Sequence, residues 1–274
     1  MNDRSVRILE ILANNKNIKI ALLAELLDIS QVTLRKDLDN LERQGIINRI
    51  HGYASLDNAD ETGKRMAFYY SIKRRIARTA AQMVEEGETI MLESGSCCAL
   101  LAEELAALRK NVTIITNSIY VTAHIRKMTN IKIILLGGHF QPESQVLIGS
   151  MTIKGAAEFF PDKFFLGADG YISGQGFTGA DHFRVETASG LAKCAKKIFV
   201  LTEAAKFQRR GAFSLVPLGS LTGVFTDDTI CAEAETDLQK SNVQLIKVTS
   251  AADEKLKWRH FPGMLPILYK ESKE

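Results

Sequence analysis

Long apolar runs are absent from this 274-residue sequence, and none approaches the roughly 18 residues that a membrane-spanning helix needs. We therefore expect no membrane span and no membrane partner. The first residues, Met1 to Arg7, start an amphipathic pattern directly, without the long apolar region of a secretory signal. These absences disfavour a secreted or membrane-anchored protein, and we expect a cytoplasmic one.

Cysteine is scarce, and its spacing matches no known framework. Cys97 and Cys98 are adjacent, whereas Cys194 and Cys231 stand alone. This arrangement is neither a disulfide framework nor the Cys-x-x-Cys pattern of a zinc site. We therefore predict four reduced, apolar side chains, and we expect no metal or other cofactor.

A strong excess of charge of one sign is also missing. The formal net charge is +3 and the pI is about 8.6, a mild basic balance that permits a nucleic-acid partner without requiring one. The composition is ordinary for a globular protein, with 46% hydrophobic and 24% charged residues. The length allows a small domain followed by a larger one with its own core.

The region from Ile18 to Ala54 carries the clearest pattern in the chain. A short apolar helix is predicted over 20–27, a turn over 28–30 and a second helix over 31–44, with Ser30 placed to cap the second helix. In that helix Leu34, Leu38 and Leu41 recur at spacings that put them on one buried face. The polar residues of the helix then lie largely on other faces: Gln31, Thr33, Arg35, Lys36 and Asn40.

A small β-hairpin is predicted directly after the second helix. The segment from Ile46 to Tyr53 alternates loosely in polarity and turns at Gly52. Helix, turn, helix and hairpin in this order indicate a DNA-reading unit, because an exposed helix face rich in donors suits the major groove. The alternative is a small helical bundle without a particular function. We disfavour it because Arg35 and Lys36 lie near the start of the second helix, where base and phosphate contacts are usually made.

The same residues resemble a known family. The run Asp28-Ile29-Ser30-x-x-Thr33-Leu34-Arg35-Lys36-Asp37-Leu38, followed by Leu41-Glu42-x-Gln44-Gly45 and Arg49-x-His51-Gly52, is similar to the winged helix-turn-helix of DeoR-type bacterial transcriptional regulators. The family usually has a second glycine where Tyr53 stands, which alters the expected wing slightly. On this basis the predicted DNA contacts are Ser30, Gln31, Thr33, Arg35, Lys36, Arg49 and His51.

A change of composition marks the domain boundary. Three acidic residues between 57 and 61 precede a stretch from Lys64 to Arg78 that holds six basic residues and no acidic one. The predicted division of the chain is a DNA-reading domain over 1–56, a linker over 57–74, a sensing and oligomerisation domain over 75–250 and a tail over 251–274.

The roles of the linker cations and of the tail are left open. The linker cations are either a supplementary phosphate-contacting surface or part of a solvated connecting helix, and we favour the helix. They are Lys64, Arg65, Lys73, Arg74 and Arg75. The tail, which contains Trp258 and Phe261, either covers an apolar patch or contacts a partner subunit.

Short apolar, β-branched runs recur from residue 89 onward. They lie at 89–92, 112–116, 131–136, 163–166, 198–201, 221–225 and 243–248, and amphipathic helical patterns such as 99–108 and 185–196 separate several of them. This rhythm predicts an α/β domain, a mostly parallel sheet with helices on its faces. In such sheets ligands bind at the carboxyl ends of the strands. The residues that follow each run are therefore the candidate site.

The loop after the first run is the main candidate for ligand binding. Glu93-Ser94-Gly95-Ser96-Cys97 leads into a helix that we expect to begin near Cys98. Its backbone NH groups, its two hydroxyls and the positive end of the helix dipole favour an oxyanion such as phosphate. A plain capped turn between strand and helix explains the same residues equally well.

The other strand ends add further polar groups. They supply Thr116-Asn117-Ser118, Gly137-Gly138, Gly167-Ala168-Asp169-Gly170 and Glu203-Ala204-Ala205-Lys206. Polar residues or glycine pairs at so many strand ends exceed what core packing requires and predict a pocket rim. His139 and His182 also lie in candidate pocket loops, although ordinary surface histidines would look the same. Facing a ligand, His182 would be a pH-sensitive donor.

These motifs also follow the order found in the effector domain of DeoR-type regulators, whose fold is similar to that of ribose-5-phosphate isomerase, glucosamine-6-phosphate deaminase and CoA transferases. The resemblance covers Val6 to Val248. The family's phosphate loop, commonly Asp-Ser-Gly-Thr-Thr, falls on residues 93–97. Its Asp-Ser-Ser-Lys-Phe appears here as Glu203-Ala204-Ala205-Lys206-Phe207, which keeps the lysine and loses both hydroxyls.

The resemblance therefore implies a phosphate site without identifying the ligand. The candidate effector contacts are Glu93, Ser94, Gly95, Ser96, Cys97, Asn117, Gly138, Asp169, His182 and Lys206.

The function that the resemblance implies is a DNA-binding regulator, a repressor of a carbohydrate-utilisation operon that is controlled by a phosphorylated sugar or sugar derivative. Its partners would be double-stranded operator DNA, the sugar effector and further copies of the chain in a homodimer or homotetramer. The alternative is a sugar-phosphate isomerase-like enzyme with an added DNA-binding domain, whose general base would be Asp169, His182 or Glu203. We favour the regulator and expect no catalysis, because the catalytic motifs of the related enzymes are not evident.

Overall fold

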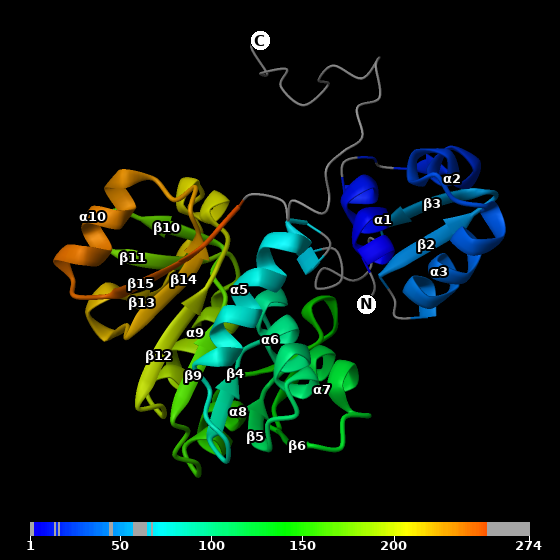
Figure 1. Ribbon diagram of the computed structural model, residues 1–274. Helices are drawn as coiled ribbons and strands as arrows, with labels where there is room; N and C mark the ends of the chain where they lie inside the picture. Colours follow the sequence, from blue (N-terminus) through cyan, green and yellow to red (C-terminus); the bar gives the residue numbers. More distant parts are fainter. Residues whose placement is uncertain are drawn as a thin grey trace.

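The structure is a computed structural model, which describes residues 3–13, 15, 17–43, 46–56, 65–66 and 68–250. Figure 1 shows an N-terminal part with helices α1 to α3 and a larger α/β part that begins at α5. The tail over 251–274 and the linker residues 57–64 and 67 lie outside the described residues. In the described part of the chain, no helix combines the length and the apolar character that crossing a membrane would need.

The N-terminal part packs helices against a small antiparallel sheet. The helices are α1 (Asp3–Ala13), α2 (Ile20–Leu27) and α3 (Gln31–Arg43), and the sheet has the order β1 (Ile18–Lys19), β3 (Tyr53–Leu56), β2 (Ile47–Ile50). Leu9, Leu23 and Leu34, one from each helix, are fully buried in its core. The predicted bounds of α2 and the predicted start of α3 are confirmed, whereas Gln44, the predicted end of α3, lies outside the described residues.

Among the described residues, the larger part is built around a seven-stranded sheet in which neighbouring strands are parallel. Across the sheet lie β15 (Gln244–Val248), β14 (Gly223–Asp227), β12 (Lys197–Leu201), β9 (Lys163–Leu166), β4 (Thr89–Leu92), β5 (Val112–Thr116) and β6 (Ile131–Leu135). They are the predicted apolar runs, and their ends differ from the prediction by at most two residues. Burial on both faces explains why these runs are continuous rather than alternating.

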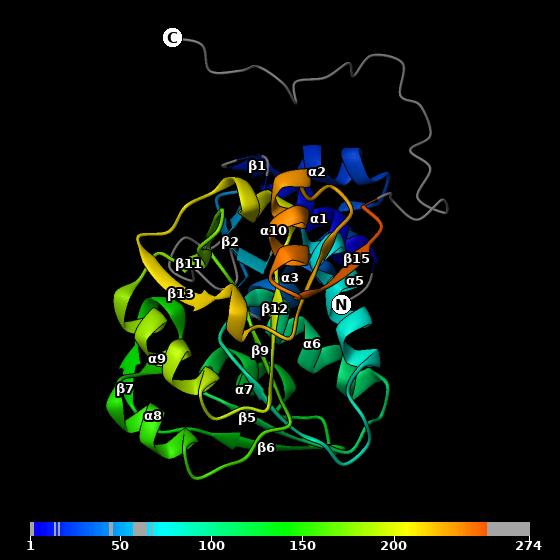
Figure 2. The ribbon, with the colours of Figure 1, turned by 90° about the vertical axis from the view of Figure 1, so that its left-hand side faces the viewer.

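Helices cover both faces of this sheet. α5 (Tyr70–Gln82), α6 (Ser96–Ala107) and α7 (Ile119–Ile125) share one hydrophobic core with it, and α8 (Ser150–Ala156), α9 (His182–Ala192) and α10 (Ala232–Lys240) share a second. Figure 2 shows α8 and α9 on one side of the strands and α5 and α6 on the other. The predicted α/β layering is confirmed. α6 begins two residues and α9 three residues before the predicted starts.

Short antiparallel elements are the part of the fold that the sequence analysis does not predict. β7 (His139–Gln141) pairs with β8 (Val146–Ile148), and β10 (Gly170–Ile172), β11 (Gly176–Gly179) and β13 (Phe213–Pro217) form a separate sheet. The 3₁₀ helices are η1 (Pro142–Ser144), η2 (Ala204–Gln208) and η3 (Leu218–Ser220). Such short strands offer too little alternation to be detected. Because β7, β10 and η2 follow β6, β9 and β12 in the chain, they shape the carboxyl edge of the central sheet.

Candidate functional site

The turn between α2 and α3 fixes the start of the predicted recognition helix. α2 ends at Asp28, which adopts a left-handed conformation with a φ of 54°. Ser30 then caps α3, because its Oγ accepts the backbone NH of Thr33 at 3.2 Å and lies 2.9 Å from the Thr33 hydroxyl. The predicted capping role of Ser30 is confirmed, and the two hydroxyls at the head of α3 hold each other.

The outer face of α3 is polar and carries unpaired cations. Gln31, Arg35, Lys36 and Asn40 are exposed, and Thr33 is half-buried. Neither basic side chain forms an ion pair with any of the described residues. The leucine face beneath is fully buried, so the predicted division of α3 into a packed and an exposed face is confirmed. An exposed helix face with free donors and free positive charge can enter a major groove.

β2 and β3 form the predicted wing. Ile50 pairs with Tyr53, so the turn consists of His51 and Gly52, and both have a positive φ, 49° and 83°. A type I′ turn, whose twist matches that of its strands, requires positive φ at both positions, which glycine adopts without strain. His51 is exposed at the tip of the wing, where a groove-facing contact would lie.

Arg49 lies on the wing but turns towards α3. Its Nε donates to Glu42 Oε2 at 2.9 Å, and its Nη2 lies 2.6 Å from Asp39 Oδ1. Hydrogen bonding to Glu42 raises the pKa of Arg49 further above its ordinary value. Two carboxylates therefore already neutralise this predicted DNA contact. In this geometry Arg49 ties the wing to the recognition helix.

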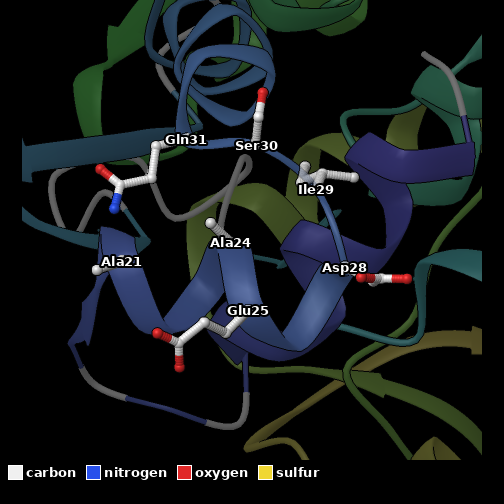
Figure 3. A pocket seen from close by; sticks show the side chains of 7 residues that line it. All are labelled: Ala21, Ala24, Glu25, Asp28, Ile29, Ser30 and Gln31. Carbon is white, nitrogen blue, oxygen red and sulfur yellow. The ribbon is translucent and has the colours of Figure 1, made fainter.

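A shallow, open depression lies beside the start of α3. It is lined by Ala21, Ala24, Glu25, Asp28, Ile29, Ser30 and Gln31 (Figure 3). Figure 3 shows the carboxylate of Glu25 pointing away from Ser30, with a second carboxylate at Asp28. Two negative charges make the depression unfavourable for an anionic ligand. It is therefore not a candidate for a phosphate site.

The candidate ligand site lies where the order of the central sheet reverses. β4 and β9 are neighbours, but the sheet continues from β4 to β5 on one side and from β9 to β12 on the other. Crevices at such switch points are where α/β sheets bind ligands. Two glycines pack closely here. A Cβ atom added to Gly95 would lie 3.3 Å from the backbone of Gly167. We call the region around the ends of β4, β9 and β12 the strand-end crevice, after the place where such sheets bind ligands.

The loop after β4 is arranged around one buried carboxylate. Glu93 accepts a hydrogen bond from Ser94 Oγ at 2.7 Å, and its other oxygen faces the NH of Gly167 at 3.4 Å. Gly95 is the N-cap residue of α6, so the free NH groups of that helix begin here. The predicted combination of hydroxyls, backbone donors and a helix start is thus present at the switch point, with the glutamate buried beneath it.

Two predicted effector residues have structural roles of their own. Asn117 is 2% exposed and donates from Nδ2 to the Leu147 carbonyl at 2.9 Å, which holds β8 against the end of β5. Its Oδ1 has no hydrogen-bond partner among the described residues. A side chain at Gly138 would lie 2.0 Å from Thr152 Oγ1, so packing against α8 explains this glycine. The buried oxygen of Asn117, in contrast, is a place where a ligand or water would bind.

Asp169, after β9, has a pKa on which three cations act. Its carboxylate accepts the backbone NH of Ala180 at 3.0 Å. Burial raises its pKa, but this hydrogen bond and the charges of Arg184, Arg65 and Lys206 more than offset burial, so the pKa lies below its ordinary value. Lys206, on η2, forms no ion pair with the described residues. The crevice therefore has more cationic groups near it than the sequence analysis assigned.

Lys73, predicted among the solvated linker cations, is buried beside the candidate site. Its side chain is 4% exposed, its Nζ donates to the backbone carbonyl of Arg65, and Nζ lies 3.9 Å from Oε1 of the buried Glu203. The interpretation of Lys73 as part of a solvated helix is therefore wrong. Lys73 shares one face of α5 with the buried residues Tyr70 and Ile76. A lysine on an apolar stripe is the sequence signal that identifies it.

The neighbours of Lys73 on α5 also have partners. Arg74 Nε lies 3.0 Å and Arg78 Nε 3.2 Å from the same carboxylate, that of Glu104. Arg75 donates to the backbone carbonyl of Ser250 at 3.3 Å. The described cations of α5 are thus not a free surface for DNA phosphates, and Lys64 lies outside the described residues.

Two further predicted residues offer little polar contact. His182 is the exposed first residue of α9, and its ring lies against Phe183 and Phe213. Cys97 is buried in the first turn of α6, and burial raises the pKa of its thiol to about 12, so it remains neutral. All four cysteines are free, as predicted, and Cys231 is exposed. The structure thus brings Glu93, Asp169 and Lys206 to one edge of the sheet and leaves His182 on the surface.

Two family models match the chain. A DeoR-like helix-turn-helix domain matches residues 4–59, and a DeoR C terminal sensor domain matches residues 69–228. The first match spans α1 to β3, and the second runs from α5 to the end of β14. The exposed face of α3 and the strand-end crevice therefore lie in separately matched domains.

Curated relatives are similar over most of their length. The HTH-type transcriptional regulator GolR of Listeria innocua serovar 6a is 29% identical over 232 residues, which are 83% of this chain and 91% of that protein. The putative aga operon transcriptional repressor of Escherichia coli O157:H7 is 24% identical over 255 residues, 90% of this chain and 94% of that protein. The L-fucose operon activator of Escherichia coli K12 is 28% identical over 231 residues, 82% of this chain and 94% of that protein.

Among solved structures, a ribose 5-phosphate isomerase from Methanocaldococcus jannaschii is similar over 50% of this chain and 54% of that chain, with 19% identity and a TM-score of 0.37. A likeness this weak carries no functional argument. The sensor-domain model, in contrast, spans more than half of the chain, and it directly follows a matching helix-turn-helix domain. The chain therefore belongs to the DeoR family of DNA-binding transcriptional regulators.

Proposed function

We propose that this regulator represses a carbohydrate-utilisation operon, and that a phosphorylated sugar bound in the strand-end crevice controls its affinity for operator DNA. The names of the relatives support a sugar operon, since one is a putative aga operon repressor and another an L-fucose operon activator. A cytoplasmic location is part of the proposal, because bacterial operators lie there. No catalytic step is included.

The DNA contacts in this proposal come from α3 and the wing. Arg35, Lys36 and Gln31 are exposed at the start of the helix, where side chains reach base edges and phosphates. Ser30, Thr33 and His51 would contact the backbone from the helix start and the wing tip. Arg49 would position the wing, since Glu42 and Asp39 hold its guanidinium.

The observation that carries the effector proposal is the gathering of cations beside the start of α6. The charges of Lys73 and Lys206 oppose the burial that raises the pKa of Cys97, in the first turn of that helix, and the charges of Arg65 and Lys206 help to lower the pKa of Asp169. Cations and free backbone NH groups together are what a phosphate requires.

Carboxylates at the same edge suit the sugar end of the ligand. Glu93 and Asp169 lie at the ends of β4 and β9, and ionised carboxylates accept hydrogen bonds from hydroxyls. The remaining proposed contacts are Ser94, Gly95, Ser96, Cys97 and Asn117 around the loop and Gly138 and His182 at its periphery. For Gly138 and His182 the support is weakest, because packing against α8 and two phenylalanine rings accounts for them.

The proposed organisation keeps a DNA-reading domain over 1–56, a linker over 57–74 that includes the start of α5, a sensing and oligomerisation domain over 75–250 and a tail over 251–274. A homodimer or homotetramer would present paired recognition helices to half-sites about 34 Å apart or at a multiple of that distance. Sedimentation with and without a palindromic DNA duplex tests this arrangement.

The isomerase-like alternative has less support. Asp169 is held by the NH of Ala180, Glu203 faces Lys73, and His182 lies on the surface. A general base must come within hydrogen-bond reach of the proton that it removes. Turnover of sugar phosphates that disappears in Asp169→Ala would favour the enzyme over the regulator.

The effector class is tested by a thermal-shift screen of phosphorylated pentoses, hexoses, hexitols and amino sugars, each beside its unphosphorylated form. A ligand at 100 times its dissociation constant should stabilise the protein by about 2.7 kcal/mol. We expect stabilisation by phosphorylated compounds only, with potassium chloride at matched ionic strength as the control. Stabilisation by the unphosphorylated sugars alone would contradict the proposed phosphate site.

A further inference from the structure

Near the start of α5, one side chain, that of Lys73, lies against both the linker and the strand-end crevice. Lys73 Nζ donates to the backbone carbonyl of Arg65, which precedes α5, and lies 3.9 Å from the Glu203 carboxylate at the end of β12. Both side chains are at most 7% exposed. One buried ammonium group therefore faces a linker carbonyl and a crevice carboxylate together.

The described linker residues lie against the sensor domain at this point. Met66 is 1% exposed, and its Sδ accepts the hydroxyl of Tyr120 at 3.6 Å. The guanidinium of Arg65 is close enough to Asp169 and Lys73 to act on the charge of both. The backbone carbonyl of Arg65 is thus held by Lys73, and the charge of Arg65 acts on a residue at the end of β9.

The positive charges of Lys206 and Arg65 act on the buried ammonium group of Lys73. Burial is the main cause that lowers the pKa of Lys73, Glu203 opposes this effect, and the neighbouring charges of Lys206 and Arg65 add to it. Like charges in a poorly solvated place repel each other. An ammonium group also has three hydrogens to donate, and at 3.9 Å Glu203 is beyond ordinary hydrogen-bond distance. A phosphate between these cations would turn repulsion into attraction.

We propose that Arg65 and Lys73 belong to the effector site, and that an anionic group bound between them and Lys206 fastens the Arg65–Met66 segment to the sensor domain. This inference rests on the proposed phosphate-bearing effector and adds how its binding reaches the DNA-reading domain. The same part of α5 contacts that domain directly, because Ser71 Oγ donates to Glu10 on α1. Ligand binding would therefore restrict the linker beside the contact between α5 and α1.

Trypsin cleavage after Arg65 reports on this contact directly. The protease attacks the carbonyl of the residue before the cleaved bond, and this is the oxygen that Lys73 holds. The experiment follows the Arg65–Met66 cleavage rate in the full-length protein by mass spectrometry, with inorganic phosphate as the probe and chloride at matched ionic strength as the control. At ten times its dissociation constant phosphate should slow this cleavage about tenfold, because only the unliganded form opens.

Lys73→Met should accelerate the cleavage and abolish the protection by phosphate. The matched control is Lys154→Met, which changes an exposed lysine of α8, a helix of the other face, and should behave like the wild type. Should Lys73→Met fail to fold, the double variant Lys73→Met/Glu203→Gln, which removes both buried charges, takes its place. Its cleavage should also be independent of phosphate.

The outcomes separate this inference from the function on which it rests. Phosphate that raises the melting temperature but leaves the Arg65–Met66 cleavage rate unchanged would overturn the linker contact while preserving the effector class. Equal protection in the wild type and the Lys73 variants would also overturn it. An absence of any stabilisation by phosphate or phosphorylated sugars would overturn the effector class, and this inference with it.

Discussion

α3 and α5 are both 13-residue helices with several basic side chains, yet they use them differently. On α3, Arg35 and Lys36 are exposed and have no ion-pair partner among the described residues. On α5, Lys73 is buried against Glu203, and Arg74 shares the Glu104 carboxylate with a second arginine. The number of cations in a helix therefore says little about function until the groups that face them are known.

The physical reason lies in hydration. Arg35 and Lys36 keep water and mobile counterions around them, and both can be released when DNA phosphates bind, which favours binding. Lys73 has already lost its water, so its charge depends on the protein groups around it. Only the first arrangement suits a surface for DNA, whereas the second suits an enclosed site for a small anion.

The largest difference between the two helices should appear in stability. Lys73→Met should lower the free energy of unfolding by about 3 kcal/mol, because Glu203 would remain buried without its cation. The matched change on α3, Lys36→Met, should stay within about 0.5 kcal/mol, since Lys36 is exposed. Urea unfolding of both variants measures the two values. Equal losses would mean that burial does not distinguish the helices.

DNA affinity should show the opposite ranking. Arg35→Ala should weaken operator binding by about 1 to 3 kcal/mol, because an exposed arginine of the recognition helix is lost. Arg74→Ala should leave operator binding unchanged, since Glu104 already holds Arg74. Fluorescence anisotropy with a selected operator duplex, at fixed salt, measures both variants. A loss of affinity in Arg74→Ala alone would mean that α5, and not α3, binds the operator.

The crevice loop should affect the ligand and not the DNA. Ser94→Ala combined with Ser96→Ala should weaken binding of a phosphorylated effector by about 1 to 2 kcal/mol, through the loss of hydroxyl donors beside the start of α6. Operator affinity without effector should stay at the wild-type value. Calorimetric titration of the effector tests the first expectation, and an unaltered affinity would remove this loop from the site.

Arg49 should give the smallest effect, because its charge is neither exposed and unpaired, as on α3, nor buried, as in Lys73. It is partly exposed and paired with Glu42 and Asp39, so Arg49→Ala should cost less than about 1 kcal/mol of stability. Operator binding should weaken only through a looser wing. Arg49→Lys, which keeps the charge, serves as the comparison in anisotropy. A large loss in Arg49→Ala that lysine restores would show that Arg49 contacts DNA through its charge.

Much of the fold could be predicted because its signals are local. The apolar runs that become the central sheet need no information from distant residues, and the capping of α3 by Ser30 depends on neighbours three residues away. The strand-end loops were predicted for the same reason, since a parallel sheet puts the carboxyl ends of its strands along one edge.

The missing parts of the site depend on contacts between distant residues. Lys73 pairs with Glu203, which lies 130 residues later in the chain. Arg65 affects the pKa of Asp169, about a hundred residues away in sequence. His182 was predicted at the pocket from its place in the chain, but α9 begins with it and leaves it on the surface. Position along the chain does not reveal which way a side chain points at the first turn of a helix.

The sequence by itself determined the order of helices and strands, the exposed polar face of α3 and the polar residues that follow the strands at one edge of the sheet. These follow from periodicity and from the geometry of parallel strands, which are properties of short segments. The tertiary structure alone decided which cations are free and which are paired. Burial and the nearest carboxylate set the state of a charged side chain, and both are supplied by segments that lie far apart in the chain.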